Sequence, residues 1–152
     1  MAILDEMKAM IGKETEPVVT EVEKGAMIKL ATAVDDPNPL WQDEKYARDT
    51  RYGGMVAHPA FVNVFRGLVY RKLIGRIQLP QGFKGVGIDG GTEIEYYHPI
   101  RPGDRITSVA KITDIKEKAG KLGPMLILTL ETTYTNQLGQ VAAKATDTSI
   151  RY

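Results

Sequence analysis

Residues 58–74 read HPAFVNVFRGLVYRKLI, and this stretch decides the fold. Its apolar residues recur at helical spacing over about four turns, with only a few polar residues between them. Pro59 suits the first turn, because a helix leaves the N–H of that position without a partner in any case. The apolar stripe is too wide for a helix that covers only the surface of a domain. The pattern therefore predicts a long helix wrapped by a sheet.

The residues after this helix supply the strands for such a sheet. Four strands are predicted, at residues 92–97, 104–118, 126–134 and 141–152. Each alternates between the two faces of a sheet, as a half-buried strand does. Turn formers at residues 119–123 and 136–139 join the last three strands as hairpins. Consecutive strands joined in this way indicate an antiparallel sheet.

The residues before the long helix read as short helices and loops. Helices are predicted at residues 4–11, 25–34 and 44–49, and a short strand at residues 17–23. At 152 residues the chain has the length of one domain, so residues 1–152 are expected to form a single unit. A helical first half and a meander in the second half predict an α+β fold, with the long helix packed on one face of the sheet.

The composition excludes several classes of protein. The net charge is +1, which lacks the basic excess of a nucleic-acid binder. There is no cysteine and there are two histidines, so thiolate chemistry, zinc fingers and multi-histidine metal sites are not expected. No apolar run approaches the roughly 20 residues that span a bilayer, and the N-terminus does not resemble a signal peptide. A cytoplasmic protein without membrane or metal partners is therefore expected.

A glycine-rich run at residues 85–90 matches the G-x-G-x-x-G pattern of dinucleotide-binding proteins. That pattern requires a helix after the last glycine, whereas residues 92–97 read as a strand. The expected role of Gly90 is therefore to permit a bulge or the close approach of a ligand or another chain.

Two further segments carry candidate functional residues. Residues 35–43, DDPNPLWQD, are the densest group of turn formers in the chain, which fits either a simple helix stop or a functional loop. His58 lies just before the long helix, where the N–H groups of Ala60 and Phe61 favour a negatively charged oxygen. His58 itself fits two readings, a helix cap or a member of an active site.

These segments resemble a known family. DPNPLWQD at residues 36–43, YGGMVAHP at 52–59 and YHPIRPGD at 97–104 look like the active-site stretches of MaoC-like (R)-specific enoyl-CoA hydratases and 3-hydroxyacyl dehydratases. The likeness is greatest to the FAS1-like, N-terminal MaoC-type dehydratase domains. It implies the hot-dog fold, a curved antiparallel sheet around one long central helix. It also implies an acyl-CoA substrate, so that CoA enters with the substrate and no separate cofactor is expected.

The chain departs from the family at one position. Active members carry D-x-N-P-hydrophobic-H, and the resemblance maps the catalytic Asp onto Asp36, while Trp41 stands where the His is expected. Imidazole suits proton transfer near neutral pH, whereas an indole N–H only donates a hydrogen bond. Members that lack this His pair with an active subunit and shape the acyl tunnel. The resemblance thus makes Asn38 and Trp41 candidate substrate contacts.

Three functions remain open from the sequence. The chain is either a subunit of an enoyl-CoA hydratase that shapes the acyl site beside a catalytic MaoC-like partner, or a self-sufficient hydro-lyase that uses Asp36 and His58. In the second case the N–H groups of Ala60 and Phe61 hold the thioester oxygen. The third function is a hot-dog thioesterase or a non-enzymatic acyl-CoA-binding module. In each case the resemblance implies an oligomer, homomeric or with another hot-dog subunit.

Overall fold

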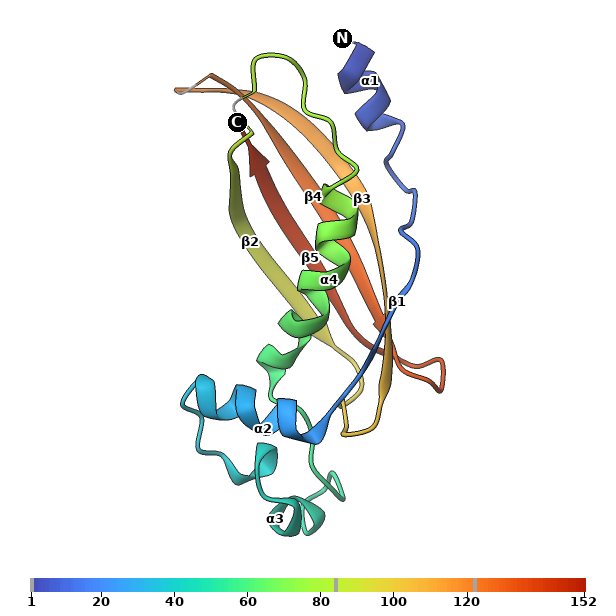
Figure 1. The fold of residues 1–152 in the computed structure, drawn as a ribbon, viewed down its shortest axis with the longest axis vertical. Helices are drawn as coiled ribbons and strands as arrows, with labels where there is room; N and C mark the ends of the chain where they lie inside the picture. The colour runs from blue at the N-terminus through green and yellow to red at the C-terminus, as the bar shows by residue number, and fades with distance from the viewer. Residues whose placement is uncertain (1, 84, 122) are drawn as a thin grey trace.

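The computed structural model describes residues 2–83, 85–121 and 123–152. Figure 1 shows a sheet with one long helix across its face and a group of short helices at one end. The elements, in chain order, are α1 (Ala2–Lys8), β1 (Val18–Glu21), α2 (Lys24–Ala33), η1 (Pro39–Trp41), α3 (Glu44–Arg48), η2 (Pro59–Phe61), α4 (Val62–Ile74), β2 (Gly87–Tyr96), β3 (Arg105–Gly120), β4 (Gly123–Thr135) and β5 (Val141–Arg151).

The sheet has five strands in the order β1-β3-β4-β5-β2, and every neighbouring pair is antiparallel. The predicted α+β class is therefore confirmed. The β3–β4 hairpin closes with Gly120 opposite Gly123. Leu122, which belongs to the predicted turn, lies outside the described residues. β2 comes first of the four later strands in the chain but occupies one edge of the sheet, next to β5.

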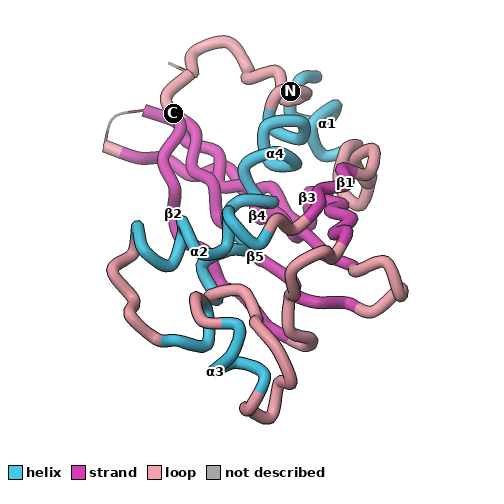
Figure 2. Tube along the Cα trace, turned by 60° about the horizontal axis from the view of Figure 1, so that its bottom comes forward, coloured by secondary structure: helices cyan, strands magenta, loops and turns pink. Residues whose placement is uncertain are grey.

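The long helix packs on one face of this sheet, and Figure 2 shows α4 in front of the strands. Its residues Phe65 and Val69 are fully buried. Phe65 belongs to a cluster with Ile106 and Tyr134, and Val69 belongs to a second cluster nearer the C-terminal end of the helix. On the side away from the sheet, Val64 and Leu68 are 42% and 40% exposed. The sheet lies along one side of the helix, which agrees with the predicted packing of the long helix on one face of the sheet.

A buried ion pair also joins α4 to the sheet. Arg66 Nη2 lies 2.7 Å from Oδ1 of Asp147, whose side chain is only 1% exposed. The same Nη2 lies 3.2 Å from Oδ2 of Asp89, which is largely exposed. Thr92 donates its hydroxyl to Asp147 Oδ1 at 2.7 Å. The carboxylate of Asp147 therefore lies between the helix and two strands.

The observed strands differ from the predicted ones mainly in β2, which begins at Gly87 instead of Thr92. The glycines of this segment hide the alternation that reveals a strand. The register shifts between Asp89 and Gly91, and Gly91 has a φ of +135°, which confirms the predicted bulge. No helix follows the run at residues 85–90, so the dinucleotide pattern is excluded.

None of the helices within the described ranges is both long and apolar enough to cross a membrane.

Candidate functional site

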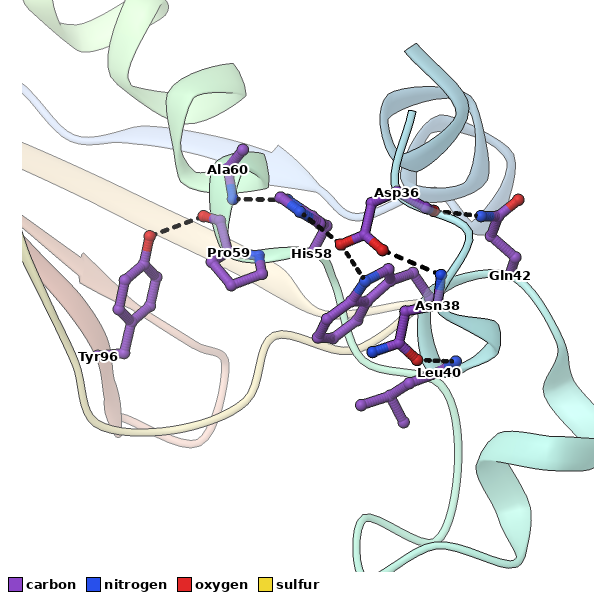
Figure 3. Close-up of polar contacts among 9 residues, drawn as sticks. Asp36, Asn38, Leu40, Gln42, His58, Pro59, Ala60 and Tyr96 are labelled. Carbon is purple, nitrogen blue, oxygen red and sulfur yellow. Dashed lines mark hydrogen bonds and ion pairs between the residues drawn. The ribbon is translucent and has the colours of Figure 1, made fainter. Parts of the chain in front are cut away.

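The candidate site forms where the segment after α2 meets the start of α4. Asp35, with a φ of +54°, turns the chain sharply at the end of α2. The N–H of Asp36 donates to the carbonyl of Ala31, which fixes the start of the loop. The side-chain amide of Gln42 donates to the carbonyl oxygen of Asp36 at 2.7 Å and closes the loop on itself. The loop thereby holds the Asp36 side chain toward the beginning of α4 (Figure 3).

The Asp36 carboxylate has three partners. Oδ1 accepts the backbone N–H of Asn38 at 3.0 Å, and Oδ2 accepts the indole N–H of Trp41 at 3.0 Å. The same Oδ2 lies 3.2 Å from Nε2 of His58. The Asn38 N–H, followed by the Trp41 indole, lowers the pKa of Asp36 below its usual 3.8. Asp36 is therefore ionised at neutral pH and holds its proton weakly.

His58 is held through both ring nitrogens. Nδ1 accepts the backbone N–H of Ala60 at 3.0 Å, so this nitrogen carries no proton in the neutral ring. The proton then resides on Nε2, which faces Asp36. The ring of Trp41 lies edge-on to the imidazole, with centroids 5.5 Å apart and planes at 76°. The structure thus brings Asp36, Trp41 and His58 together as one hydrogen-bonded group. The sequence analysis had paired only Asp36 with His58, as one of its alternatives.

The amides at the start of the helix have internal partners. The N–H of Ala60 bonds to His58 Nδ1, and the N–H of Phe61 donates to the carbonyl of His58 at 2.8 Å. The Phe61 side chain is buried and packs edge-on against Phe65. Both N–H groups are therefore occupied in this conformation, and their contact with a thioester oxygen stays a prediction. The reason is local: in the turn that begins at His58 and Pro59, both N–H groups donate to acceptors of His58, one to its ring and one to its carbonyl.

Asn38 also acts within the loop. Its side-chain oxygen accepts the N–H of Leu40 at 3.0 Å and caps η1. Since its own N–H donates to Asp36, Asn38 holds the shape of the turn that carries Asp36 and Trp41. This arrangement agrees with the interpretation of residues 35–43 as a turn. A contact between Asn38 and the substrate stays a prediction.

Gly90 lies apart from this group, on β2. A Cβ at this position would come within 2.9 Å of Thr148 Cγ2 and 3.1 Å of the Thr148 carbonyl oxygen. Glycine is needed there because β5 approaches closely, so the close approach is made by the chain's own strand. A ligand contact at Gly90 remains a prediction.

A cavity of about 340 Å³ adjoins the Asp36 group, with Trp41 and Pro59 in its wall. Most of the other lining side chains are aromatic or apolar: Tyr52, Val56, Ala57, Tyr96, Tyr97, His98, Pro99 and Ile100. Tyr96 reaches across to the helix start, where its hydroxyl donates to the Pro59 carbonyl at 2.8 Å (Figure 3). Burial raises the pKa of Tyr96 above 10.0, so its hydroxyl stays protonated and able to donate.

The sequence analysis did not name Tyr96 or Tyr97 of this wall as site residues, although Tyr97 opens one of the stretches that resemble the family. The dipeptide Tyr96-Tyr97 before His98-Pro99 was a visible signal, because binding pockets are lined mainly by apolar and aromatic side chains. What the sequence did not show is that this strand end lies beside Pro59. Within the described ranges, no group of three or more His, Asp or Glu side chains is placed to hold a metal ion.

Comparison with known proteins agrees with this architecture. The family model described as the FAS1-like dehydratase domain region matches residues 9–145. A UPF0336 protein of Thermobifida fusca is 31% identical over 124 residues, which cover 82% of this chain and 78% of that protein. The crystal structure of a MaoC-like dehydratase from Rhodospirillum rubrum is 28% identical and superposes with a TM-score of 0.69, covering 93% of this chain and 92% of its own.

The fold extends to more distant structures. The HadBC (3R-hydroxyacyl-ACP dehydratase) complex from Mycobacterium tuberculosis superposes with a TM-score of 0.79 at 20% identity, covering 93% of this chain and 96% of that one. These likenesses, together with the antiparallel sheet and its long helix, identify the fold as the hot dog. The chain belongs to the FAS1-like dehydratase family, related in fold to the MaoC-like dehydratases.

Proposed function

We propose that this chain is a subunit of an acyl-thioester hydratase or dehydratase, in which it shapes the acyl site while a partner MaoC-like chain supplies the catalytic Asp/His pair. The observation that carries this proposal is the hydrogen bonding of His58. Its Nδ1 accepts the Ala60 N–H, and its Nε2 faces Asp36. In this conformation the neutral ring has no lone pair left for a water molecule.

The proton chemistry of the reaction explains why this matters. Adding water to an enoyl thioester requires a base that takes a proton from the water and an acid that delivers one to carbon. Asp36 has a lowered pKa and is a weak base. Trp41, at the position of the family's catalytic histidine, can only donate. The group of Asp36, Trp41 and His58 is therefore suited to holding the loop against the helix.

The adjoining cavity supports a role in binding the acyl group. Its volume of about 340 Å³ is in the range of small-molecule sites, and none of its lining residues is an Asp, Glu, Lys or Arg. An apolar chain or ring would be desolvated there at little cost. We place the acyl part of a CoA thioester in this cavity. The hydration or dehydration of that thioester would be a step of fatty-acid metabolism in the cytoplasm.

A second candidate is a self-sufficient hydratase, and the 3.2 Å distance between His58 Nε2 and Asp36 Oδ2 favours it. In that case Asp36 orients the ring through Nε2–H and Nδ1 becomes the base toward water, the same division of roles as in the Ser-His-Asp triad but with the two ring nitrogens exchanged. The Ala60 N–H must first leave Nδ1, which would also free that amide for the thioester oxygen. The two candidates therefore differ in whether His58 Nδ1 ever faces substrate.

The decisive experiment measures hydration of a trans-2-enoyl-CoA by the purified chain, alone and with a co-expressed MaoC-like partner. The variants are His58→Ala and His58→Asn, because asparagine can still cap the helix but cannot accept a proton. We expect no turnover by the chain alone, turnover with the partner, and the same turnover when the chain carries His58→Asn. Turnover by the chain alone that both variants abolish would establish the second candidate instead.

The remaining alternatives have their own outcomes in this assay. Release of free CoA without hydration would identify a thioesterase. Binding of the thioester without turnover in either setting would identify a binding module. Trp41 is the chain's single tryptophan and lies in the cavity wall, so its fluorescence reports binding directly.

A further inference from the structure

Four buried polar side-chain atoms have no hydrogen-bond partner among the described residues, and all four lie between α4 and the sheet. They are Nε of Arg66, Oγ of Ser108, the hydroxyl of Tyr134 and Oδ2 of Asp147. Ser108 and Tyr134 are fully buried, and Asp147 is 1% exposed. Folded proteins pair nearly all of their buried polar groups, so such a cluster needs an explanation. A bound ligand that supplies the missing partners is one.

Three of these residues, Arg66, Tyr134 and Asp147, form what we call the inner polar group. Arg66 and Asp147 already share the 2.7 Å contact between Nη2 and Oδ1, which leaves Nε and Oδ2 without partners in the described part of the chain. Burial, followed by the nearby charge of Asp147, raises the pKa of Tyr134 above its ordinary 10.0. The Tyr134 hydroxyl therefore stays protonated and is able to donate a hydrogen bond.

The inner polar group lies two strands away from the wall of the cavity. Tyr96 of that wall is opposite Ala143 on β5, and Ala143 is opposite Tyr134 on β4. Directly paired residues share a face of the sheet, and neighbouring strands are about 4.8 Å apart. In this row a single methyl group, that of Ala143, separates Tyr96 from Tyr134. Tyr96 is 49% exposed, and its hydroxyl is held by the Pro59 carbonyl (Figure 3), so turning this ring aside opens the cavity toward Tyr134.

The unpaired atoms of the inner polar group select the chemistry of a ligand. Arg66 Nε–H and the Tyr134 hydroxyl are donors, whereas Asp147 Oδ2 is an acceptor. A hydroxyl group accepts from a donor and donates to the carboxylate at the same time. A carbonyl oxygen has no proton to donate to Asp147, and a carboxylate is repelled by it. An alcohol therefore fits this group better than either alternative.

We propose that the inner polar group binds a hydroxyl group at the far end of the acyl chain, which reaches it past Tyr96. This hydroxyl is distinct from any hydroxyl at the reacting carbon. The inference rests on the proposed function, because it defines which acyl group the same cavity accepts. The preferred ligand is then a thioester whose acyl chain ends in a hydroxyl group, and Tyr134 is a residue that determines this preference.

Binding of matched thioesters tests the assignment. Isothermal titration calorimetry compares octanoyl-CoA with and without a terminal hydroxyl group, and butyryl-CoA with and without one, on the chain alone and with its co-expressed partner. We expect the hydroxyl to tighten binding of the octanoyl thioester at least about tenfold, because its absence leaves buried donors and an acceptor unpaired. The butyryl pair should bind equally, since that chain is too short to span two strand spacings of about 9–10 Å.

Tyr134→Phe removes the unpaired hydroxyl and keeps the ring that lies against Phe65. The preference for the hydroxylated octanoyl thioester should disappear in this variant, while plain octanoyl-CoA binds as in wild type. Tyr97→Phe is the matched control, because it removes the hydroxyl of a tyrosine in the cavity wall that bonds to Glu95 instead. This control should keep the preference.

Thermal unfolding shows whether the Tyr134 hydroxyl is unpaired in the free protein. Removing an unpaired buried hydroxyl costs no hydrogen bond, so Tyr134→Phe should not lower Tm. Thr92→Val, which removes a hydroxyl that does bond to Asp147, should lower it and shows that the measurement is sensitive enough. A lower Tm of Tyr134→Phe, together with equal binding of the two octanoyl thioesters, would identify water as the only occupant and overturn the inference.

Two further results would overturn it: a hydroxyl that adds nothing to octanoyl binding in wild type, which needs no variant to measure, or a preference that survives in Tyr134→Phe. Plain octanoyl-CoA reports on the proposed function separately. If it binds and the hydroxyl adds nothing, only the inference fails. If neither octanoyl thioester binds, alone or with the partner, the proposed acyl site fails and the inference fails with it.

Discussion

The buried pair of Arg66 and Asp147 predicts an unequal response to removing either partner. Asp147 is 1% exposed, whereas Arg66 is 21% exposed and also contacts the exposed Asp89. Arg66→Met leaves a buried carboxylate whose remaining partner is the Thr92 hydroxyl. Asp147→Leu leaves an arginine that still has Asp89 and water. The first variant should therefore lose much more stability than the second.

The magnitudes follow from the cost of isolating a buried charge. We expect Arg66→Met to lower the free energy of unfolding by about 3–5 kcal/mol at pH 7. Asp147→Leu should lower it by about 1–2 kcal/mol, since its partner keeps a second carboxylate. The double variant Arg66→Met/Asp147→Leu should lie within about 1 kcal/mol of wild type, because it buries no unpaired charge.

The loss in Arg66→Met should also depend on pH. The isolated carboxylate escapes its charge by binding a proton in the folded state, while the unfolded chain releases that proton at neutral pH. The folded state then binds more protons than the unfolded state, so acidification stabilises this variant relative to wild type. Its deficit should shrink between pH 8 and pH 5, while that of Asp147→Leu should stay constant.

Urea unfolding followed by circular dichroism at pH 5, 7 and 8 measures all four proteins of this double-mutant cycle. Equal losses for the two single variants, or a loss in Arg66→Met that does not change with pH, would refute the argument that Asp147 is the more deeply isolated partner. A double variant as unstable as Arg66→Met would show that packing, and not charge, sets the cost.

Three further predictions concern the loop and the edge strand. Trp41→Phe removes the indole donor, so the pKa of Asp36 should rise toward 3.8. In wild type the lowered pKa adds stability above about pH 4, and this stability is lost as the pH falls through the lowered pKa. The variant should therefore gain less stability from this carboxylate. Carboxyl NMR titration measures this rise, and an unchanged pKa contradicts it. His58→Ala should lower the free energy of unfolding by about 1 kcal/mol through loss of the helix cap, and His58→Asn should lower it by much less. Thermal unfolding of the two variants measures this difference, and equal losses would contradict the capping role. Gly90→Ala should cost about 1–3 kcal/mol, because its Cβ meets Thr148 at 2.9 Å, and urea unfolding that matches wild type would rule this out.

The sequence predicted the elements whose signals are local. The helix at residues 62–74 has a strong apolar period, and β3 and β4 alternate clearly, so each was identified close to its observed bounds. The first half of β2 was missed because its glycines give no alternation. The edge position of β2 was also not predicted, because its pairing with β5 joins residues more than 45 positions apart.

The site was predicted less completely than the fold. Asp36 was identified from the resemblance and His58 from its place before the long helix, and the 3.2 Å contact between them agrees with the alternative that pairs the two. The sequence offered a helix cap as one reading of His58, and the hydrogen bond from the Ala60 N–H to Nδ1 confirms it. The cavity wall likewise combines Trp41 with Tyr96, which come from segments far apart in the chain.

The helix α4 is synthesised before four of the five strands of the sheet, and this order has a consequence during translation. The helix ends at Ile74, and β5, whose alanines Ala143 and Ala145 lie in the same core cluster as Phe65, ends at Arg151. At a translation rate of about 5–20 residues per second, the ribosome needs roughly 4–15 s to add the intervening residues. Until β5 has been made, the sheet that covers the apolar face of the helix is incomplete. We therefore expect that slowing translation after residue 74 leaves the apolar face of this helix exposed for longer and increases aggregation of the nascent chain.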